Sequence, residues 1–298
     1  MSRPRHAVRI RVPATSANLG PGFDCLGLAL QLYDEVTVEV IDAGLEIDVV
    51  GEGAEEVPRD GSHLVVAAFR AGSERLGGQP SGIRLSARNA IPHGRGLGSS
   101  AAAVCAGLLA ARGLHPDGAA LLPDSEVLAL AAGFEGHPDN VAACLLGGLT
   151  IVWTEGESPR AVRLDPHDDV SVTLLVPHAR LSTHTARGLL PTQVPHSDAA
   201  RNAGRSALLV HALTAAPWLL LPATADWLHQ PYRAPAMPKT AALLARLRDS
   251  GIPAVVSGAG PSVAAFTDVD LAGDLSAGWT LHPLAVDTLG AVLTPLSA

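Results

Sequence analysis

The segment Pro92–Ala103, PHGRGLGSSAAA, decides the fold, and the residues on either side of it show why. Residues 83–87 alternate between apolar and polar, which is typical of a strand, and residues 104–113 are rich in Ala and Leu, which is typical of a helix. The alternate glycines let the backbone approach a ligand closely, and Ser99 or Ser100 is expected to cap the helix. Free N–H groups and the dipole at a helix start attract anions, so the segment predicts a phosphate site.

Two better-known phosphate loops do not match this segment. The Walker A loop needs a lysine before its serine or threonine, and Lys239 is the only lysine in the chain. The dinucleotide fingerprint needs a third glycine where Ser99 stands. A glycine-rich turn that only precedes a capped helix therefore remains an alternative, and the segment by itself does not decide between the two.

Composition argues against several classes of function. Aromatic residues make up 3% of the 298 residues and the net charge is −8, so base-stacking platforms and a basic surface for nucleic acid or an anionic membrane are absent. Neither a secretory signal nor an apolar run long enough for a membrane span is present. The three cysteines show no pairing pattern, which favours a reduced, cytoplasmic protein.

Periodicity along the chain indicates an α+β protein, with a domain boundary near residues 155–168. Strands are expected at 8–12, 34–40, 45–50, 83–87, 149–153, 170–176, 254–256 and 263–266. Helices are expected at 62–76, from the serines to about 113, at 124–132, 138–147, 197–215, 223–229 and 238–249.

Further polar segments could contribute to a site. They are Thr15–Asp24 (TSANLGPGFD), Glu135–Asn140 (EGHPDN) and Ser257–Ser262 (SGAGPS), together with Arg187 and Arg233. Taken singly, each is explained as well by an Asx turn, a helix cap, a tight turn or a solvated arginine. They become informative only in combination.

In chain order, the motifs P-x-x-S-A-N-L-G-x-G-F-D, P-x-x-x-G-L-G-S-S-A-A, E-G-H-P-D-N-x-A and S-G-A-G-P-S resemble those of the homoserine kinases. These enzymes belong to the superfamily of galactokinase, homoserine kinase, mevalonate kinase and phosphomevalonate kinase. The motifs run from residue 13 to residue 262, and the arginine-rich sequence resembles the actinobacterial branch. The resemblance implies an ATP-binding domain at residues 1–160, like ribosomal protein S5 domain 2, and a ferredoxin-like domain at residues 161–298.

The resemblance also implies the reaction and its site. ATP and Mg²⁺ would act with L-homoserine to give O-phospho-L-homoserine for threonine synthesis, in the cytoplasm, with no nucleic-acid or membrane partner; a homodimer is one alternative for the assembly. Residues implied at the reacting end of the substrate are Asn18, Asp24, His137, Asp139 and Asn140. Those implied for the rest of the substrate are Thr183, Arg187 and Arg233. Those implied for ATP are Pro92, Gly94, Arg95, Gly96, Leu97, Gly98, Ser99, Ser100, Ala101, Gly258 and Gly260, with Ser100 also near Mg²⁺.

The chain departs from the family pattern at one position. Gly133 stands where the family has the glutamate that binds Mg²⁺, and Glu135 is expected to point about 200° away from it on a helix. Asn140, where mevalonate kinase has an aspartate base, implies a substrate hydroxyl that is aligned by its neighbours. Because of Gly133, two alternatives stay open: a paralogue for another hydroxy amino acid, and a nucleotide-binding protein with impaired catalysis.

Overall fold

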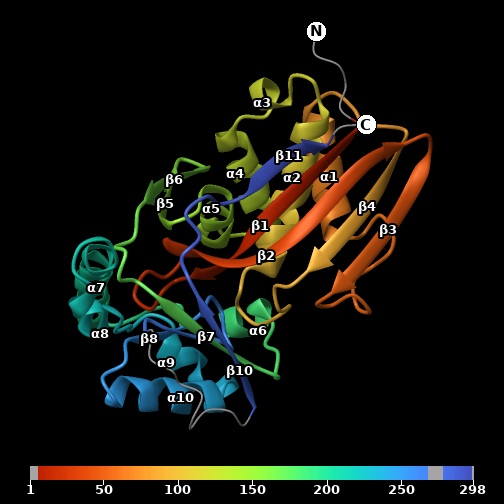
Figure 1. Cartoon of the computed structure of the whole chain (residues 1–298). Coiled ribbons are helices and arrows are strands. Elements are labelled where there is room, and N and C mark those ends of the chain that lie inside the picture. The colour runs from red at the N-terminus through yellow and green to blue at the C-terminus, as the bar shows by residue number, and fades with distance from the viewer. Residues whose placement is uncertain (1–5, 268–277, 297–298) are drawn as a thin grey trace.

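The computed structural model describes residues 6–267 and 278–296, which form a seven-stranded sheet and a four-stranded sheet with helices packed against both (Figure 1). The two-domain α+β fold expected from the sequence is confirmed. No helix within these residues is long and apolar enough to cross a membrane.

The first sheet follows the order β11-β1-β2-β4-β3, and β5 pairs with β2 and with β6. Its strands are β1 (Ala7–Ala17), β2 (Leu26–Ile41), β3 (Gly44–Gly51), β4 (Gly82–Asn89), β5 (Leu149–Glu155), β6 (Ser158–Leu164) and β11 (Val292–Leu296). The pairs are antiparallel except β3 with β4. Alternation along β1 places Val8, Ile10 and Val12 in the core.

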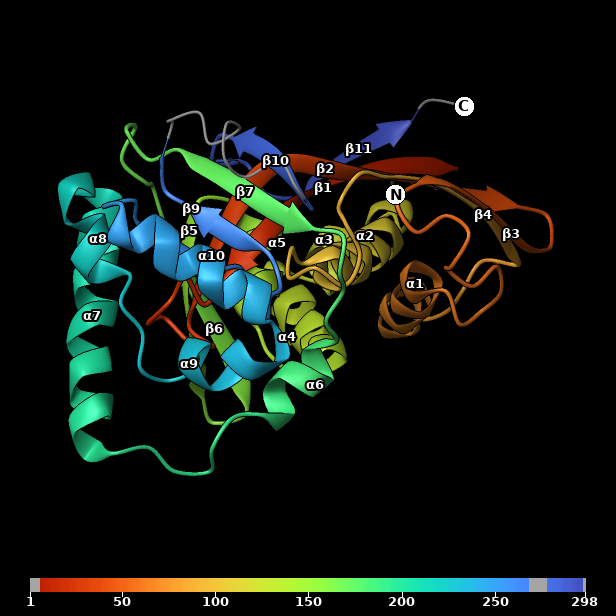
Figure 2. The ribbon, with the colours of Figure 1, turned by 90° about the horizontal axis from the view of Figure 1, so that it is seen from below.

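Helices cover one face of this sheet (Figure 2). They are α1 (Leu64–Arg75), α2 (Ser99–Leu114), α3 (Gly118–Leu121), α4 (Asp124–Glu135) and α5 (Asp139–Leu146). The central helix, α2, is buried along most of its length between β1 and α1 because its residues are small and apolar. Its N-terminus is thereby fixed against the sheet.

The second sheet has the order β10-β7-β9-β8 and is antiparallel. Its strands are β7 (Val172–Pro177), β8 (Ala254–Val256), β9 (Val263–Ala265) and β10 (Trp279–Leu284). The helices of this half are α6 (Thr183–Gly188), α7 (His196–Thr214), α8 (Leu220–Ala223), α9 (Gln230–Arg233) and α10 (Pro238–Asp249), with short 3₁₀ turns at Pro217–Leu219 and Ala234–Ala236. Helix α10 buries Leu243 and Leu247 against this sheet.

Several expected elements differ in detail. The expected first strand continues to Ala17 as β1, so the polar loop begins only at Asn18. The expected helix 223–229 is wrong, because the buried Asp226 carboxylate accepts the N–H groups of residues 228–230 and starts the short helix α9 instead. Helix α1 begins at Leu64, two residues later than expected, and the hydroxyl of Ser62 donates to Asp60.

The sheets do not follow the chain in a simple order. Strand β6 crosses the boundary expected at residue 160, and β11 returns from the end of the described chain to pair with β1. Strands β10 and β11 and helix α6 were not predicted, because their residues are half-buried or exposed and lack a clear apolar period. The division into residues 1–160 and 161–298 stays a prediction.

Candidate functional site

The glycine loop, residues 93–100, leads from the first sheet into α2. Gly98 has φ 72° and is the residue before the helix, while Ser99 and Ser100 are its first two residues, so the expected serine cap is wrong. A side chain at position 98 would begin 1.9 Å from Thr15 Oγ1, which explains the glycine. No side chain among the described residues caps α2, so its first N–H groups are available to an anion.

The segment SGAGPS, residues 257–262, packs against the glycine loop from the other half of the molecule. Ser257 Oγ donates to Gly96 O at 2.8 Å, and Gly258 N donates to Ala17 O at 3.1 Å. A Cβ on Gly96 would lie 2.2 Å from Ser257 O, so the two backbones could not come this close with any other residue there. The two glycine-rich segments together form one surface of the candidate site.

The loop between β1 and β2 carries unusual backbone. Asn18, Leu19 and Asp24 are the non-glycine residues with positive φ among those described, at 68°, 51° and 54°. Asn18 donates from Nδ2 to Gly258 O at 2.8 Å and accepts the Asp24 N–H at 2.9 Å. Such backbone costs about 1–3 kcal/mol per residue and clusters at functional sites. Asn18 therefore fixes the position of Asp24.

Arg187 and Asp24 form a two-point ion pair. Arg187 Nη2 donates to Asp24 Oδ1 at 2.6 Å and Nη1 to Oδ2 at 3.1 Å, and both side chains are half-exposed. Asp24 raises the pKa of Arg187 through this pair. The contact joins the β1–β2 loop to α6 at the edge of the site.

Arg233 is 1% exposed and has no carboxylate partner among residues 6–267 and 278–296. Its guanidinium donates to Ala186 O at 3.3 Å, to Gly258 O at 3.3 Å and to His229 Nδ1 at 3.1 Å. Burial lowers the pKa of Arg233 and the nearby positive charge of Arg187 lowers it further, while the carboxylates of Asp24, Asp226 and Asp139 partly offset this without forming an ion pair with it. A buried charge without a counter-ion is costly, so this geometry indicates an anion site.

The ring of Phe23 lies under both guanidinium groups. The Cζ atom of Arg187 is 5.7 Å from the ring centroid and that of Arg233 is 5.4 Å from it. A cation above an aromatic face is stabilised by the ring quadrupole. Phe23 thus helps to bring two positive charges to the same cavity.

The EGHPDN segment contributes a histidine–carboxylate pair. His137 Nδ1 and Asp139 Oδ1 are 2.8 Å apart, and this hydrogen bond raises the pKa of His137. The same oxygen accepts the Asn140 N–H at 2.8 Å. Asn140 Oδ1 accepts from Thr15 Oγ1 at 2.7 Å, which leaves the amide N–H groups of Asn140 for a ligand.

Glu135 contradicts the expectation that it points away from the phosphate site. Ser100 Oγ donates to Glu135 Oε1 at 2.5 Å. Gly133 faces open space, with no heavy atom within 4 Å of an added Cβ. Glu135 is the last residue of α4, so its side chain reaches the start of α2 where a residue two positions earlier would not.

These groups meet in one cavity. Its lining comes from both halves of the molecule: Asn18, Gly94, Gly96, Leu97, Gly98, Ser99, Ser100, Glu135, His137, Asp139, Asn140, Leu181, Ser182, Thr183, Arg187, Arg233, Gly258 and Ala259. Among the predicted residues, Pro92, Arg95, Ala101, Gly260 and Asp24 are not part of this lining. Asp24 lies behind it, paired with Arg187. The side chain of Arg95 donates to Pro177 O, His93 O and His178 O and so ties the glycine loop to β7.

A second, mainly apolar cavity adjoins the first at Ser99 and Ser100. Asp34 and His63 line it, and His63 Nδ1 is buried without a hydrogen-bond partner in the described part of the chain. Burial raises the pKa of Asp34 to about 6, although its Oδ1 accepts the N–H groups of residues 90 and 91. An apolar cavity with a few unsatisfied polar groups suits a small organic ligand.

Sequence reasoning missed several residues of the site. Thr15, Phe23 and Glu135 stood inside quoted motifs but were given no role, because nothing local shows which way a side chain points. His229 is four residues before Arg233. That spacing places both on one face of a helical turn, and it was the available signal.

Comparison with known proteins agrees with this geometry. The family models described as GHMP kinases N terminal domain and GHMP kinases C terminal match residues 63–148 and 209–280. The chain is 58% identical to homoserine kinase of Streptomyces coelicolor over 98% of this chain and 96% of that one, and 53% identical to homoserine kinase of Rhodococcus erythropolis over 88% and 86%.

A solved structure supports membership of the same family. The crystal structure of homoserine kinase from Cytophaga hutchinsonii superposes with a TM-score of 0.82, at 27% identity, over 99% of both chains. The chain therefore belongs to the GHMP kinases and, within that class, to the homoserine kinase family.

Proposed function

We propose that this protein transfers the γ-phosphoryl group of ATP to the side-chain hydroxyl of L-homoserine, giving O-phospho-L-homoserine for threonine synthesis. The observation that carries the proposal is Arg233, a buried guanidinium without a carboxylate partner among the described residues, in the same cavity as the N-terminus of α2. One cavity thus offers a place for the carboxylate of a small amino acid beside a place for phosphate. The homoserine kinases named above support the choice of amino acid.

The substrate carboxylate would bind at Arg233 and Arg187. Arg187 already has Asp24 as a partner, whereas Arg233 has only neutral ones, so Arg233 is the stronger attraction for an anion. Asp139, 1% exposed, offers a carboxylate to the substrate ammonium, and Thr183 adds a hydroxyl. The two guanidinium groups and the Asp139 carboxylate would together bind the α-carboxylate and the α-ammonium and so orient the amino acid.

Phosphoryl transfer passes through a loose transition state, so positioning and charge stabilisation dominate catalysis. The glycine loop and the first N–H groups of α2 would hold the phosphates. Asn140 cannot act as a base, because an amide does not accept a proton usefully. We propose that Asn140 and His137, whose ring Asp139 holds by a hydrogen bond, align the substrate hydroxyl toward the phosphate held at α2.

The nucleoside would occupy the adjoining apolar cavity. Ser99 and Ser100 line both cavities, so a nucleotide bound there would pass its phosphates across the start of α2. The unpaired Nδ1 of His63 would gain a hydrogen-bond partner from the base. Stacking of an ATP base against the walls needs no basic surface, which fits the net charge of −8.

Mg²⁺ is implied by the family, and the residues beside the phosphate site fit it. Ser100 and Glu135 offer a hydroxyl and a carboxylate oxygen 2.5 Å apart, and Mg²⁺ commonly takes one or two protein carboxylates together with phosphate oxygens and water. When bound, Mg²⁺ neutralises charge on the phosphates. We propose that Glu135 supplies the carboxylate that Gly133 lacks, so Gly133 is no reason to expect impaired catalysis.

The Mg²⁺ site can be tested without turnover. Mn²⁺ binding in the presence of a non-hydrolysable ATP analogue, followed by electron paramagnetic resonance, should weaken in Glu135→Gln, which keeps the shape and the contact with Ser100. Glu157→Gln, at the exposed β5–β6 turn, is the control. Equal Mn²⁺ affinity in all three proteins would exclude Glu135 as a ligand.

The substrate itself is tested by offering MgATP with homoserine, serine or threonine and identifying the products by phosphorus NMR. Homoserine should be used most efficiently, because a pocket discriminates one methylene by about 1–3 kcal/mol. Equal or better use of serine would contradict the homoserine assignment and favour a paralogous function.

Two further points remain proposals. Cys25, Cys105 and Cys144 are free thiols, which fits the reducing cytoplasm as the place where the enzyme acts. A homodimer is one possible assembly, and size-exclusion chromatography with light scattering would establish the mass in solution.

A further inference from the structure

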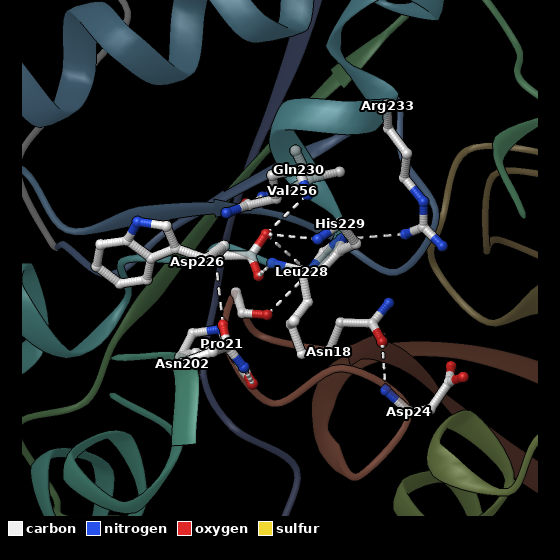
Figure 3. Close-up of polar contacts among 12 residues, drawn as sticks. Asn18, Pro21, Asp24, Asn202, Asp226, Leu228, His229, Gln230, Arg233 and Val256 are labelled. Atoms are coloured by element: carbon white, nitrogen blue, oxygen red, sulfur yellow. Dashed lines mark hydrogen bonds and ion pairs between the residues drawn. The ribbon is translucent and has the colours of Figure 1, made fainter. Parts of the chain in front are cut away.

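His229 is a fully buried histidine that contacts both halves of the site (Figure 3). Its Nε2 lies 2.8 Å from Gly20 O, in the β1–β2 loop that also carries Asn18 and Asp24. Its Nδ1 lies 3.1 Å from Arg233 Nη1. The ring therefore bridges the backbone of the first half and the unpaired guanidinium of the second.

The partners of His229 determine its protonation. A carbonyl oxygen can only accept, so Nε2 must carry the hydrogen that is donated to Gly20 O. A guanidinium can only donate, so Nδ1 must be bare and accept from Arg233. His229 is thus neutral, as the Nε2–H tautomer; burial lowers its pKa, and this outweighs the Asp226 carboxylate, whose Oδ2 lies 3.5 Å from Nε2 and raises it. A second proton on Nδ1 would place two donors and two positive charges face to face.

Neighbouring groups hold the ring in place. Asp226 Oδ2 accepts the backbone N–H of His229 at 3.2 Å and fixes the start of α9, while Phe23 stacks on the ring at a centroid distance of 5.2 Å. Gln230 Oε1 accepts the Val256 N–H at 2.6 Å, which ties the same turn to β8 (Figure 3). Side chains packed this way cannot change rotamer without breaking several contacts.

Arg233 has little else to orient it. Its remaining hydrogen bonds go to the carbonyls of Ala186 and Gly258 at 3.3 Å, which is long for an N–H···O bond. His229 is thus the one side chain among the described residues that the guanidinium contacts by a hydrogen bond.

We propose, on the basis of the carboxylate-binding role given to Arg233 above, that His229 is a positioning residue for substrate recognition. Its unprotonated Nδ1 accepts a hydrogen bond from the Arg233 guanidinium and holds it in the orientation that binds the substrate carboxylate. Its Nε2–H sets that orientation relative to the β1–β2 loop, where Asp24 lies. The competing view is a buried histidine that only stabilises the fold.

Two substitutions separate the two hydrogen bonds of the ring. Asn carries an oxygen on Cγ, where His carries Nδ1, so His229→Asn retains an acceptor for Arg233 and loses the donor to Gly20. Gln carries its amide nitrogen one bond further out, so His229→Gln retains the donor to Gly20 and loses the acceptor at the Nδ1 position. Both variants remove one hydrogen bond from the same buried site, and each therefore controls for the other.

The assay compares kcat/KM for L-homoserine with kcat/KM for 3-aminopropan-1-ol, which is homoserine without its carboxylate. His229→Gln should raise the KM for homoserine about tenfold or more and lower the ratio of the two kcat/KM values by a similar factor, since a lost hydrogen bond to a charged group is large enough to do so. His229→Asn should keep the KM within about threefold of wild type. The KM for ATP should change in neither variant.

Arg233→Ala separates failure of this inference from failure of the proposed function. If Arg233→Ala lowers the ratio and His229→Gln does not, His229 has no positioning role although Arg233 binds the carboxylate. If Arg233→Ala leaves the ratio unchanged, the carboxylate site itself is wrong. Equal effects of His229→Gln and His229→Asn would identify a purely structural histidine.

A measurement on the unaltered protein guards against variants that do not fold. Long-range ¹H–¹⁵N NMR spectra at neutral pH should show one buried neutral imidazole as the Nε2–H tautomer, assigned to His229 because its signal is absent from whichever variant folds. A protonated ring or an Nδ1–H tautomer would rule out the hydrogen bond with Arg233 and overturn the proposal.

Discussion

Replacing Arg233 by methionine tests whether this residue serves the substrate or the fold. Methionine has a similar length and no charge, and it removes the hydrogen bonds to Ala186 O, Gly258 O and His229 Nδ1. Gly258 O keeps its bond from Asn18 at 2.8 Å, so two buried acceptors lose a partner.

The expected change in stability is small because two large terms offset each other. Two unpaired acceptors cost about 1–3 kcal/mol each. Removing a buried ion that has no carboxylate within ion-pair distance among the described residues recovers several kcal/mol of desolvation and removes the repulsion from Arg187, but it also loses the attraction of the Asp24, Asp226 and Asp139 carboxylates. The free energy of unfolding should therefore stay within about 2 kcal/mol of wild type.

Substrate binding, in contrast, should suffer strongly. A charge-assisted hydrogen bond to the carboxylate is worth about 1.5–3 kcal/mol, which corresponds to a KM for homoserine raised roughly 10- to 150-fold. The KM for ATP should stay near the wild-type value, because the site proposed for the phosphates is the start of α2. Steady-state kinetics and urea unfolding measure the two effects on the same preparation.

Arg248→Met is the matched control. Arg248 is a half-buried arginine whose guanidinium also donates to neutral oxygens, those of Thr224, Leu221 and Ala254, and partial burial lowers its pKa as well. It lies outside the cavity, so its loss should not change the KM for homoserine. The reasoning is refuted if Arg233→Met binds homoserine normally, or if Arg248→Met impairs binding equally.

Three further predictions concern other groups. Gly133→Glu should raise the free energy of unfolding by up to about 1 kcal/mol, because the exposed position is free of neighbours, and it should not restore Mn²⁺ affinity in the Glu135→Gln background, because a side chain at position 133 does not reach the start of α2; a loss of stability would contradict the open surroundings. Asp139→Asn should lower the pKa of His137, followed by NMR of its Cε1–H. A raised histidine pKa stabilises the fold below pH 6.5 and loses this effect as pH rises through the folded pKa, so variant and wild type should differ more at about pH 6 than at about pH 9. The Asp34→Asn variant should be about 3 kcal/mol more stable than wild type at about pH 8, because burial raises the pKa of Asp34 from 3.8 to about 6 and the wild-type fold loses stability as this carboxyl ionises; chemical denaturation should show the difference vanish below about pH 4.

The sequence by itself determined the local parts of the site. The glycine loop, the turn between β1 and β2, the EGHPDN segment and the SGAGPS segment are each continuous in the chain. Backbone approach and helix starts depend on neighbours in sequence, so residue type and spacing are sufficient to predict them. Helix α10 was predicted at its observed bounds, Pro238–Asp249, because its apolar residues recur with a helical period.

Only the tertiary structure decided how these parts pair. Asp24 and Arg187 are 163 residues apart, and Ser100 and Glu135 are 35 apart, so no local pattern could show that they touch. The sequence placed Glu135 on the wrong side because helix geometry gives the angle between two residues of one helix but not the direction in which that helix faces. Arg233 and His229 are four residues apart in the sequence, but their role depends on burial. An exposed guanidinium is solvated by water and needs no ionic partner, whereas a buried guanidinium is stabilised by a bound anion.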